Sequence, residues 1–286
     1  MNPQKAFPPS PLVTSDGLSL HRRSWPANPE NHGIIAFMHG YAEHSGRYEH
    51  VGAFFSKQGF AFHAVDLRGH GQSSGPRVNV RRFEDYINDA ALFCQILRQE
   101  HPGLPLFLYG HSMGSIIVLL TALWRDIQPA GVVIASAPLK VPQYVGWWKL
   151  LLVRLAGKIW PGMPIEKRID SSLLSRNASV VQSYVNDPLN YQGPWKARLG
   201  LSLLLAVRDA RAQAHQFQCP LLVLHGQDDA IAEPTGSIWF EQNAASPDKT
   251  LKIYPGLYHE LHNEPEWHTV LADAAQWMRR RCGSIS

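Results

Sequence analysis

PLFLYGHSMGSIIVLLTALW, residues 105–124, places a short apolar run, a serine between two glycines and a longer apolar run in succession. The first run is typical of a buried strand and the second of a helix. Between them, Gly110-His111-Ser112-Met113-Gly114 matches G-x-S-x-G, a tight turn that lifts a serine hydroxyl out of a sheet and sets it at a helix N-terminus. Ser112 is therefore a candidate nucleophile, with an ordinary glycine-rich turn as the alternative.

Short apolar runs alternate with helical patterns along the rest of the chain. We predict strands at Leu18–Trp25, Gly33–Met38, Phe60–Val65, Leu106–Tyr109, Val132–Ala135, Leu221–Leu224 and Leu251–Tyr254. Apolar residues three or four apart predict a helix over Phe83–Gln99, and a second helix is expected over Glu264–Arg281. Strands that alternate with helices indicate an α/β fold, with a mostly parallel central sheet and helices on both faces.

One interval departs from this alternation. From residue 138 to residue 211 the sequence shows no clear strand, and such a length is too great for a loop inside a compact sheet. We predict an inserted helical cap over 138–211 and a core formed by 1–137 and 212–286. Within the cap, Val145–Trp160 combines tryptophans with lysine and arginine, which favours a helix at a membrane interface; a packed cap helix is the alternative.

A serine hydroxyl needs a base to remove its proton, and that base needs a carboxylate to orient it. In the α/β-hydrolase fold these residues follow in the order serine, acid, histidine, each on a loop after a strand. LLVLHGQDDAI (221–231) supplies Asp228 or Asp229, and LKIYPGLYHELH (251–262) supplies His259 or His262. We favour Asp229, and we favour His259 as the first histidine after its strand.

The negatively charged oxygen formed during acyl transfer requires N–H donors that are already in position. One is expected to be the backbone N–H of Met113, directly after the nucleophile. The other is expected after the early strand that ends at His39-Gly40, which suggests the N–H of Tyr41; a turn that merely ends the strand is the alternative.

Composition limits the classes of protein to be considered. The chain has 286 residues, 45% of them hydrophobic, and 27 basic against 23 acidic side chains. Basic residues are scattered, so we expect no nucleic-acid partner. Three widely spaced cysteines suggest free thiols in a reducing, cytoplasmic setting, and no secretory signal or membrane span is apparent.

Several longer motifs resemble those of the monoacylglycerol lipases and their bacterial lysophospholipase-like relatives. They are HGYAEHSGRY (39–48), GHGQS (69–73), GHSMG (110–114), DSSLLSRN (170–177) and DKTLKIY (248–254). The resemblance, which runs from about Asp16 to Arg280, implies an α/β-hydrolase with a helical cap and an apolar tunnel for one acyl chain. It implies hydrolysis of a monoacylglycerol to glycerol and a fatty acid through an acyl-enzyme, without metal or cofactor. It also implies that five residues surround the glycerol: Glu43, Arg47, His111, Tyr184 and His262.

Other interpretations of these residues remain open. Glu43 and Arg47 are four residues apart and could form a local ion pair, and Tyr184 could belong to the interior of the cap. The same catalytic residues would serve a lysophospholipase or a broad carboxylesterase. A hydrolase fold that only binds lipid is a further alternative, which the intact serine, acid and histidine disfavour.

Overall fold

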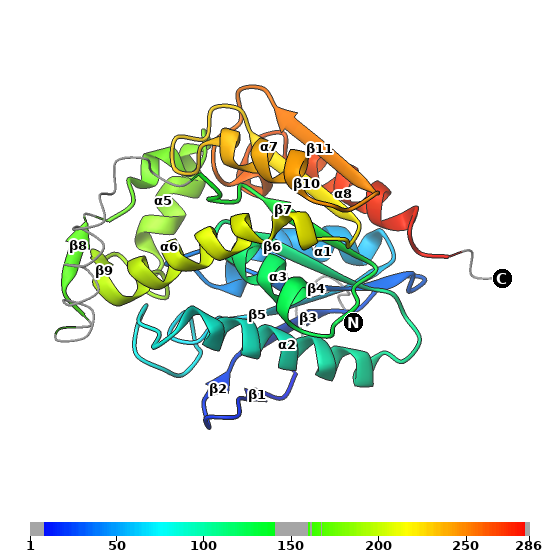
Figure 1. Cartoon of the computed structure of the whole chain (residues 1–286), viewed down its shortest axis with the longest axis horizontal. Coiled ribbons are helices and arrows are strands. Elements are labelled where there is room, and N and C mark those ends of the chain that lie inside the picture. Colours follow the sequence, from blue (N-terminus) through cyan, green and yellow to red (C-terminus); the bar gives the residue numbers. More distant parts are fainter. Residues whose placement is uncertain (1–8, 141–159, 161, 167, 284–286) are drawn as a thin grey trace.

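A computed structural model describes residues 9–140, 160, 162–166 and 168–283. In this part of the chain, seven strands form one sheet in the spatial order β11-β10-β7-β6-β4-β5-β3 (Figure 1). In chain order they are β3 (Arg22–Trp25), β4 (Gly33–Met38), β5 (Phe60–Val65), β6 (Leu106–His111), β7 (Gly131–Ala135), β10 (Leu221–Gly226) and β11 (Lys249–Tyr254). Within this sheet β3 pairs antiparallel with β5, and the other pairs are parallel. The predicted mostly parallel sheet is confirmed.

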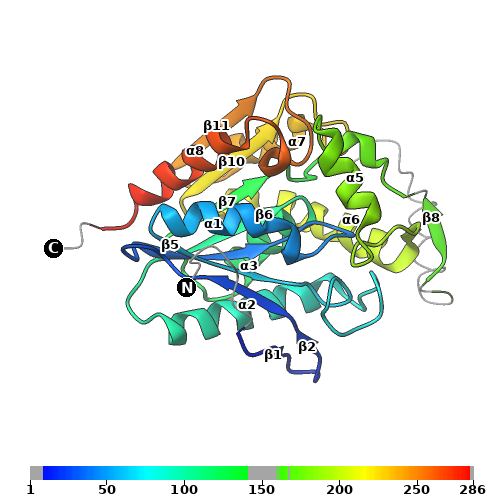
Figure 2. The ribbon, with the colours of Figure 1, turned by 180° about the vertical axis from the view of Figure 1, so that it is seen from behind.

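Helices cover both faces of the sheet, which is why strands such as β4, β5 and β6 are buried along their whole length. On one face lie α1 (Glu49–Lys57) and α8 (Trp267–Arg279), seen in front in Figure 2. On the other lie α2 (Phe83–Glu100), α3 (Met113–Trp124) and α6 (Ala197–Ala212). Two apolar clusters, one on each side of the sheet, form the core.

Element boundaries agree with the sequence patterns to within two residues at most places, and larger differences occur at three. The helix expected over Phe83–Gln99 is α2, one residue longer. The segment Leu18–Trp25 divides into β2 (Ser19–Leu20), which pairs with β1 (Leu12–Val13), and β3 in the main sheet. The helix expected from Glu264 begins later, at Trp267, after the short η4 (Leu261–Asn263). Two further helical elements are η1 (Ser45–Tyr48), after β4, and α7 (Pro234–Asn243), after β10.

The third difference lies between β7 and β10, where the sequence shows no clear strand. Two short strands, β8 (Pro164–Glu166) and β9 (Trp195–Lys196), pair there antiparallel. Strands of two or three residues are too short to produce a recognisable apolar pattern. The other elements described in this interval are helical: η2 (Ser171–Leu173), α5 (Ala178–Asn186), α6 and η3 (Ala214–Gln216). The division into core and cap at 138 and 211 stays a prediction, and Val145–Trp160 lies outside the described residues except for Trp160.

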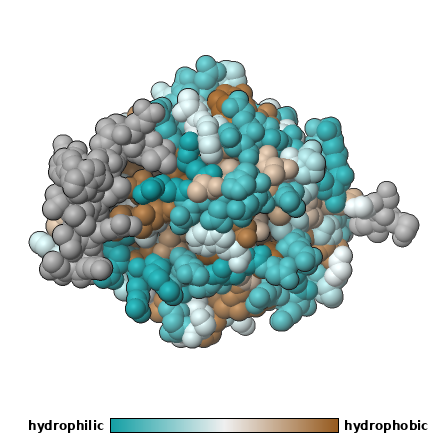
Figure 3. Space-filling view, in the orientation of Figure 1, coloured by the Kyte–Doolittle hydropathy of each residue, from teal (hydrophilic) through white to brown (hydrophobic). Residues whose placement is uncertain are grey.

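The described surface is mainly polar. Figure 3 shows one face covered mostly by hydrophilic residues. Large apolar side chains exposed in the described part of the chain are Val13, Trp160 and Val185. Among the helices described, none combines the length and the apolar character that crossing a membrane requires.

Candidate active site

Ser112 lies between the end of β6 and the start of α3, in a backbone conformation that residues other than glycine rarely adopt (φ 51°, ψ −119°). Two glycines make this turn possible. A Cβ on Gly114 would lie 2.1 Å from the carbonyl oxygen of Met38, and one on Gly110 would lie 2.3 Å from that of Gly114. Strain of this kind persists where the surrounding structure enforces it, and it is frequent at active sites.

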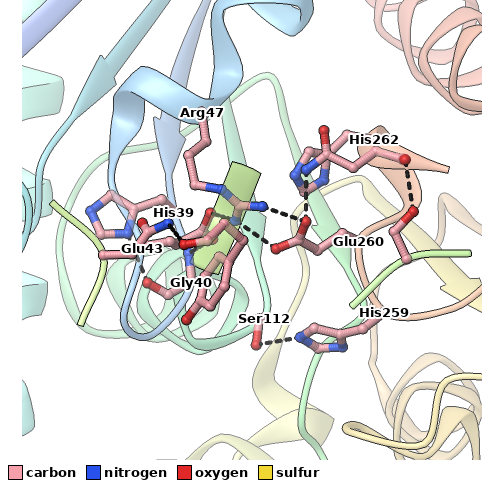
Figure 4. A network of polar contacts seen from close by, with 12 residues as sticks. His39, Gly40, Glu43, Arg47, Ser112, His259, Glu260 and His262 are labelled. Carbon is pink, nitrogen blue, oxygen red and sulfur yellow. Dashed lines mark hydrogen bonds and ion pairs between the residues drawn. The ribbon is translucent and has the colours of Figure 1, made fainter. Parts of the chain in front are cut away.

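Three side chains from separate loops form a hydrogen-bonded chain. His259 Nε2 lies 3.0 Å from Ser112 Oγ, and His259 Nδ1 lies 2.8 Å from Asp229 Oδ2 (Figure 4 shows the first contact). Asp229 follows β10 and His259 follows β11, so the carboxyl ends of three parallel strands bring the groups together. With its Nδ1–H donated to Asp229, His259 presents Nε2 to accept the serine proton.

The structure distinguishes the two adjacent aspartates. Asp228 is exposed, whereas Asp229 is buried and its Oδ1 also accepts from the N–H groups of Ile231 (2.9 Å) and Ala232 (2.8 Å). Burial raises the pKa of Asp229, but the charge of His259 and the hydrogen bonds to the carboxylate outweigh it, so this pKa lies well below its usual range. The carboxylate beside the histidine is therefore ionised at neutral pH.

His225, which the sequence interpretation missed, supports Asp229 from the other side. Its Nε2 lies 3.1 Å from Asp229 Oδ2 and 2.6 Å from the carbonyl oxygen of Ala232, while Nδ1 contacts Ser237 Oγ at 2.8 Å. The histidine in LLVLHGQDDAI carries no sequence signal for this role, because many buried strands end in a polar residue.

The environment of His259 adjusts its basicity. Burial lowers the pKa of this imidazole, but the Asp229 carboxylate and its hydrogen bond more than compensate, and the pKa is raised above its ordinary value. A base whose protonated form is stabilised by a neighbouring carboxylate suits proton transfer from a hydroxyl.

Of the residues predicted to supply N–H donors, Met113 follows Ser112 in the chain and Tyr41 lies on a separate loop. Met113 is the first residue of α3. A Cβ on Gly40 would lie 3.2 Å from Ser112 Cβ, so the loop that carries Tyr41 passes close to the nucleophile. The Tyr41 ring stacks on Trp195 of β9 with centroids 3.7 Å apart, which anchors this loop against the segment between β7 and β10.

A buried charge network lies beside these residues (Figure 4). Arg47 Nη1 donates to Glu43 Oε2 (2.8 Å) and to Glu260 Oε1 (2.6 Å), and Nη2 donates to Glu260 Oε2 (2.7 Å). Side-chain exposure is 8% for Arg47, 3% for Glu43 and 2% for Glu260. The ion pair between Glu43 and Arg47, which the sequence left open, is present. Arg47 also binds a second carboxylate, that of Glu260, which the sequence interpretation missed.

Further donors complete the network, which joins the loop after β4 to the loop that carries His259. Glu43 Oε1 accepts from the N–H of Gly40 (2.6 Å) and from Tyr48 Oη (2.8 Å). Glu260, the residue after His259, accepts from Asn263 Nδ2 at 2.7 Å. Burial opposes the charge on Glu260, but Arg47 and its hydrogen bonds lower the pKa of this carboxyl. The loop after β4 is thereby linked through Arg47 to the loop that carries the histidine.

Two other predicted residues, His111 and His262, have unused hydrogen-bonding capacity. Both are buried, and His111 Nδ1 and His262 Nε2 have no partner among the described residues. The His111 ring lies 4.8 Å from that of His262 and 4.9 Å from that of His259. Burial, and then the neighbouring histidine charge, lowers the pKa of His111 to about 4 and that of His262 well below its ordinary value. Both imidazoles are thus neutral at neutral pH.

Tyr184, the last of the predicted polar group, is a buried residue of α5. The guanidinium carbon of Arg47 lies 4.8 Å from the centre of its ring. The residue thus packs on the charge network from the segment between β7 and β10.

The segment after β8 is attached directly to the histidine loop. The N–H of Glu260 donates to the carbonyl oxygen of Leu174 (2.8 Å), and Ser175 Oγ donates to that of Asn263 (2.9 Å). From the sheet, Ser136 Oγ donates to the carbonyl oxygen of His259 at 2.6 Å. The main chain around His259 is therefore held from both sides.

The nucleophile turn, the serine–histidine–aspartate contacts and the parallel sheet define a serine hydrolase of the α/β-hydrolase fold.

Comparison with known proteins shows to which family of these hydrolases the chain belongs. A family model described as serine aminopeptidase, S33, matches residues 29–266. The chain is 35% identical over 254 residues to the monoacylglycerol lipase of Mycolicibacterium smegmatis, covering 89% of this chain and 90% of that protein. It is 36% identical over 274 residues to the monoglyceride lipase of Homo sapiens, covering 94% and 90%. The chain belongs to the monoglyceride lipase family.

A solved structure supports the same assignment. The crystal structure of the Paleococcus ferrophilus monoacylglycerol lipase superposes with a TM-score of 0.81 at 30% identity, covering 92% of this chain and 99% of that one. The resemblance read from the sequence motifs is confirmed at the level of the family and of the fold.

Proposed function

We propose that this protein hydrolyses monoacylglycerols to glycerol and a free fatty acid through an acyl-enzyme intermediate. The observation that carries the proposal is the hydrogen-bonded chain from Ser112 through His259 to Asp229, in a chain at least 35% identical to two monoacylglycerol lipases. In this reaction Ser112 is the nucleophile, His259 the base and Asp229 the group that orients the imidazole.

The contacts suggest the following order of events. Ser112 Oγ attacks the ester carbonyl while its proton passes to His259 Nε2, and the N–H groups of Tyr41 and Met113 stabilise the resulting oxyanion. His259 then gives the proton to the glycerol oxygen, which leaves as the alcohol. Water attacks the acyl-enzyme, again losing its proton to His259, and the fatty acid is released as Ser112 regains its proton.

The alcohol side of the site is assigned to the five polar residues predicted from the family motifs. Within this group, His111 and His262 have buried ring nitrogens that find no partner in the described part of the chain, so they are suited to bond the two free hydroxyls of glycerol. Glu43 and Arg47 already bond each other and Glu260, so their contribution is to hold the pocket wall in a fixed, charged arrangement with Tyr184 packed on it.

The test compares three substrates with purified protein: a monoacylglycerol, lysophosphatidylcholine with the same acyl chain, and a short-chain ester. We expect the highest kcat/KM for the monoacylglycerol. A preference for lysophosphatidylcholine or for the short ester would instead assign the protein as a lysophospholipase or a carboxylesterase.

The nucleophile is tested separately with Ser112→Ala. This variant should lose ester hydrolysis by several orders of magnitude, and it should lose labelling by a fluorophosphonate, because the three residues act as a unit. Ser115→Ala is a matched control, since that hydroxyl donates to the backbone carbonyls of Gly110 and Ala135. Unlabelled but folded wild-type protein would support the non-catalytic lipid-binding alternative.

We also infer peripheral contact with a lipid surface, where such substrates reside. Trp147 and Trp148, on which the sequence interpretation depends, lie outside the described residues; Trp160 at the end of the same stretch is 62% exposed. Trp160→Ser should weaken cosedimentation with anionic vesicles, whereas Val13→Ser, at an equally exposed apolar residue (65%), should not. Equal cosedimentation of the two variants would remove the support for contact through this stretch.

A further inference from the structure

Three side chains of metal-binding type meet where β5 packs near the end of α2. They are His63 of β5 and the consecutive residues Glu100 and His101, which end α2. One ligand atom from each lies within 4.8 Å of those of the other two, and the two imidazole centroids are 4.9 Å apart. In the described part of the chain, no hydrogen bond or ion pair joins these residues to Ser112, His259 or Asp229, and the ester hydrolysis proposed above does not use them.

His63 is an unusual residue for a buried strand position. Its neighbours Phe62 and Ala64 belong to the apolar cluster packed by α1 and α8, so His63 points to the opposite face of the sheet, toward α2. The residue is 95% buried, and its Nε2 has no hydrogen-bond partner among the described residues. A buried polar atom without a partner costs about 1–3 kcal/mol, which is why such atoms in native proteins call for an explanation.

Glu100 supplies the third ligand and is held in place by a cation. Arg22 Nη2 donates to Oε1 at 2.9 Å and Nη1 donates to Oε2 at 3.3 Å. Each carboxylate oxygen keeps a lone pair, because a carboxylate can accept about four hydrogen bonds. Arg22 also neutralises the charge of Glu100, so we expect the three ligands to bind a divalent ion with lower affinity than an unpaired carboxylate would allow.

The exposure of the cluster is graded, as an accessible ion site requires. His63 is buried, His101 is half-buried and the Glu100 side chain is 38% exposed. An ion could therefore enter from solvent on the side of α2 and keep a water molecule as its fourth ligand.

We propose that His63, Glu100 and His101 form a Zn²⁺ site that links strand β5 to the C-terminal end of α2. Two imidazole nitrogens and one carboxylate oxygen are a ligand set that tetrahedral zinc accepts, with water in the remaining position. An ion bound there satisfies the buried imidazole and joins β5 to the end of the helix that follows it in the chain.

The test titrates metal-free, full-length protein with Zn²⁺ and follows thermal unfolding, with Co²⁺ absorption in the visible range as a second readout. The melting temperature should rise with Zn²⁺ concentration, because an ion that binds only the folded chain stabilises it. Co²⁺ should give the intense bands of a four-coordinate ion.

His101→Gln is the decisive variant because this half-buried residue can be replaced without opening the core. It should weaken Zn²⁺ binding about tenfold or more, since even the loss of an outer partner of a ligand has an effect of that size. His215→Gln, at an exposed histidine on another element, is the matched control and should bind as the wild type does. Equal binding by wild type and His101→Gln, or no stabilisation of the wild type by Zn²⁺, would overturn the proposal.

Discussion

Replacing Arg47 by methionine should lower the free energy of unfolding more than the loss of any surface ion pair would. Arg47 makes three bonds of 2.6–2.8 Å to two carboxylates, and all three side chains are at least nine-tenths buried. Methionine retains much of the volume but leaves Glu43 and Glu260 as adjacent buried negative charges.

The magnitude follows from the partners that remain. Removing one partner of a buried ion pair costs about 3–5 kcal/mol. Glu43 would keep the Gly40 N–H and Tyr48 Oη, and Glu260 would keep Asn263 Nδ2, so we expect the lower end, about 3 kcal/mol. Without the cation, burial raises the folded-state pKa of Glu260 above the unfolded value. The variant is then less destabilised at pH 5, where Glu260 can be protonated, than at pH 8.

The assay is urea unfolding at pH 5 and pH 8, with stability obtained by linear extrapolation. Arg82→Met is the control: its side chain is 64% exposed and lies 3.6–4.0 Å from Asp85 and Glu84, so its loss should cost less than about 1 kcal/mol. The double variant Arg47→Met with Glu260→Leu should recover about 1 kcal/mol or more relative to Arg47→Met, since one of the stranded charges is gone. A loss below about 1 kcal/mol for Arg47→Met, or strict additivity in the double variant, would refute the reasoning.

Three further outcomes are expected of the catalytic residues. Asp229→Asn should reduce kcat by several orders of magnitude because the amide permits the wrong imidazole tautomer, whereas exposed Asp228→Asn should be mild; the reverse ranking would move the acid by one position. Because Asp229 raises the pKa of His259, kcat/KM of the wild type should fall as the pH drops through a value above the ordinary histidine range, and an acid limb at or below that range would contradict this. Glu43→Gln should reduce hydrolysis of a monoacylglycerol more than that of a p-nitrophenyl ester with the same acyl chain; parallel losses would limit Glu43 to supporting its loop.

The sequence was sufficient to predict the sheet and the contacts among Ser112, His259 and Asp229, because both follow from patterns and from the order of residues along the chain. Buried strands appear as apolar runs, and the order of serine, aspartate and histidine after successive strands is a consequence of the fold. The choice of Asp229 over Asp228 depended on spacing, and the structure agrees in burial and hydrogen bonding.

Glu260 could not be predicted in the same way. Its partner Arg47 is 213 positions away in the chain, and the sequence offered only the nearer partner four residues before it. Charged residues are usually exposed, so a glutamate beside a catalytic histidine gives no sign that it is buried. Similarly, the two-residue strand β9 has no pattern of its own; it forms because β8 is brought beside it.

The hydrogen bond from the Glu260 N–H to the Leu174 carbonyl makes one amide a reporter of active-site opening. An amide proton exchanges with deuterium only when its hydrogen bond opens, at a rate set by the free energy of that local opening. Because residue 260 follows the base directly, each opening also releases the main chain of His259 from the segment around Leu174. Deuterium uptake at this single position would therefore measure how often the free enzyme loosens its base, and the degree to which a bound acyl chain suppresses that motion.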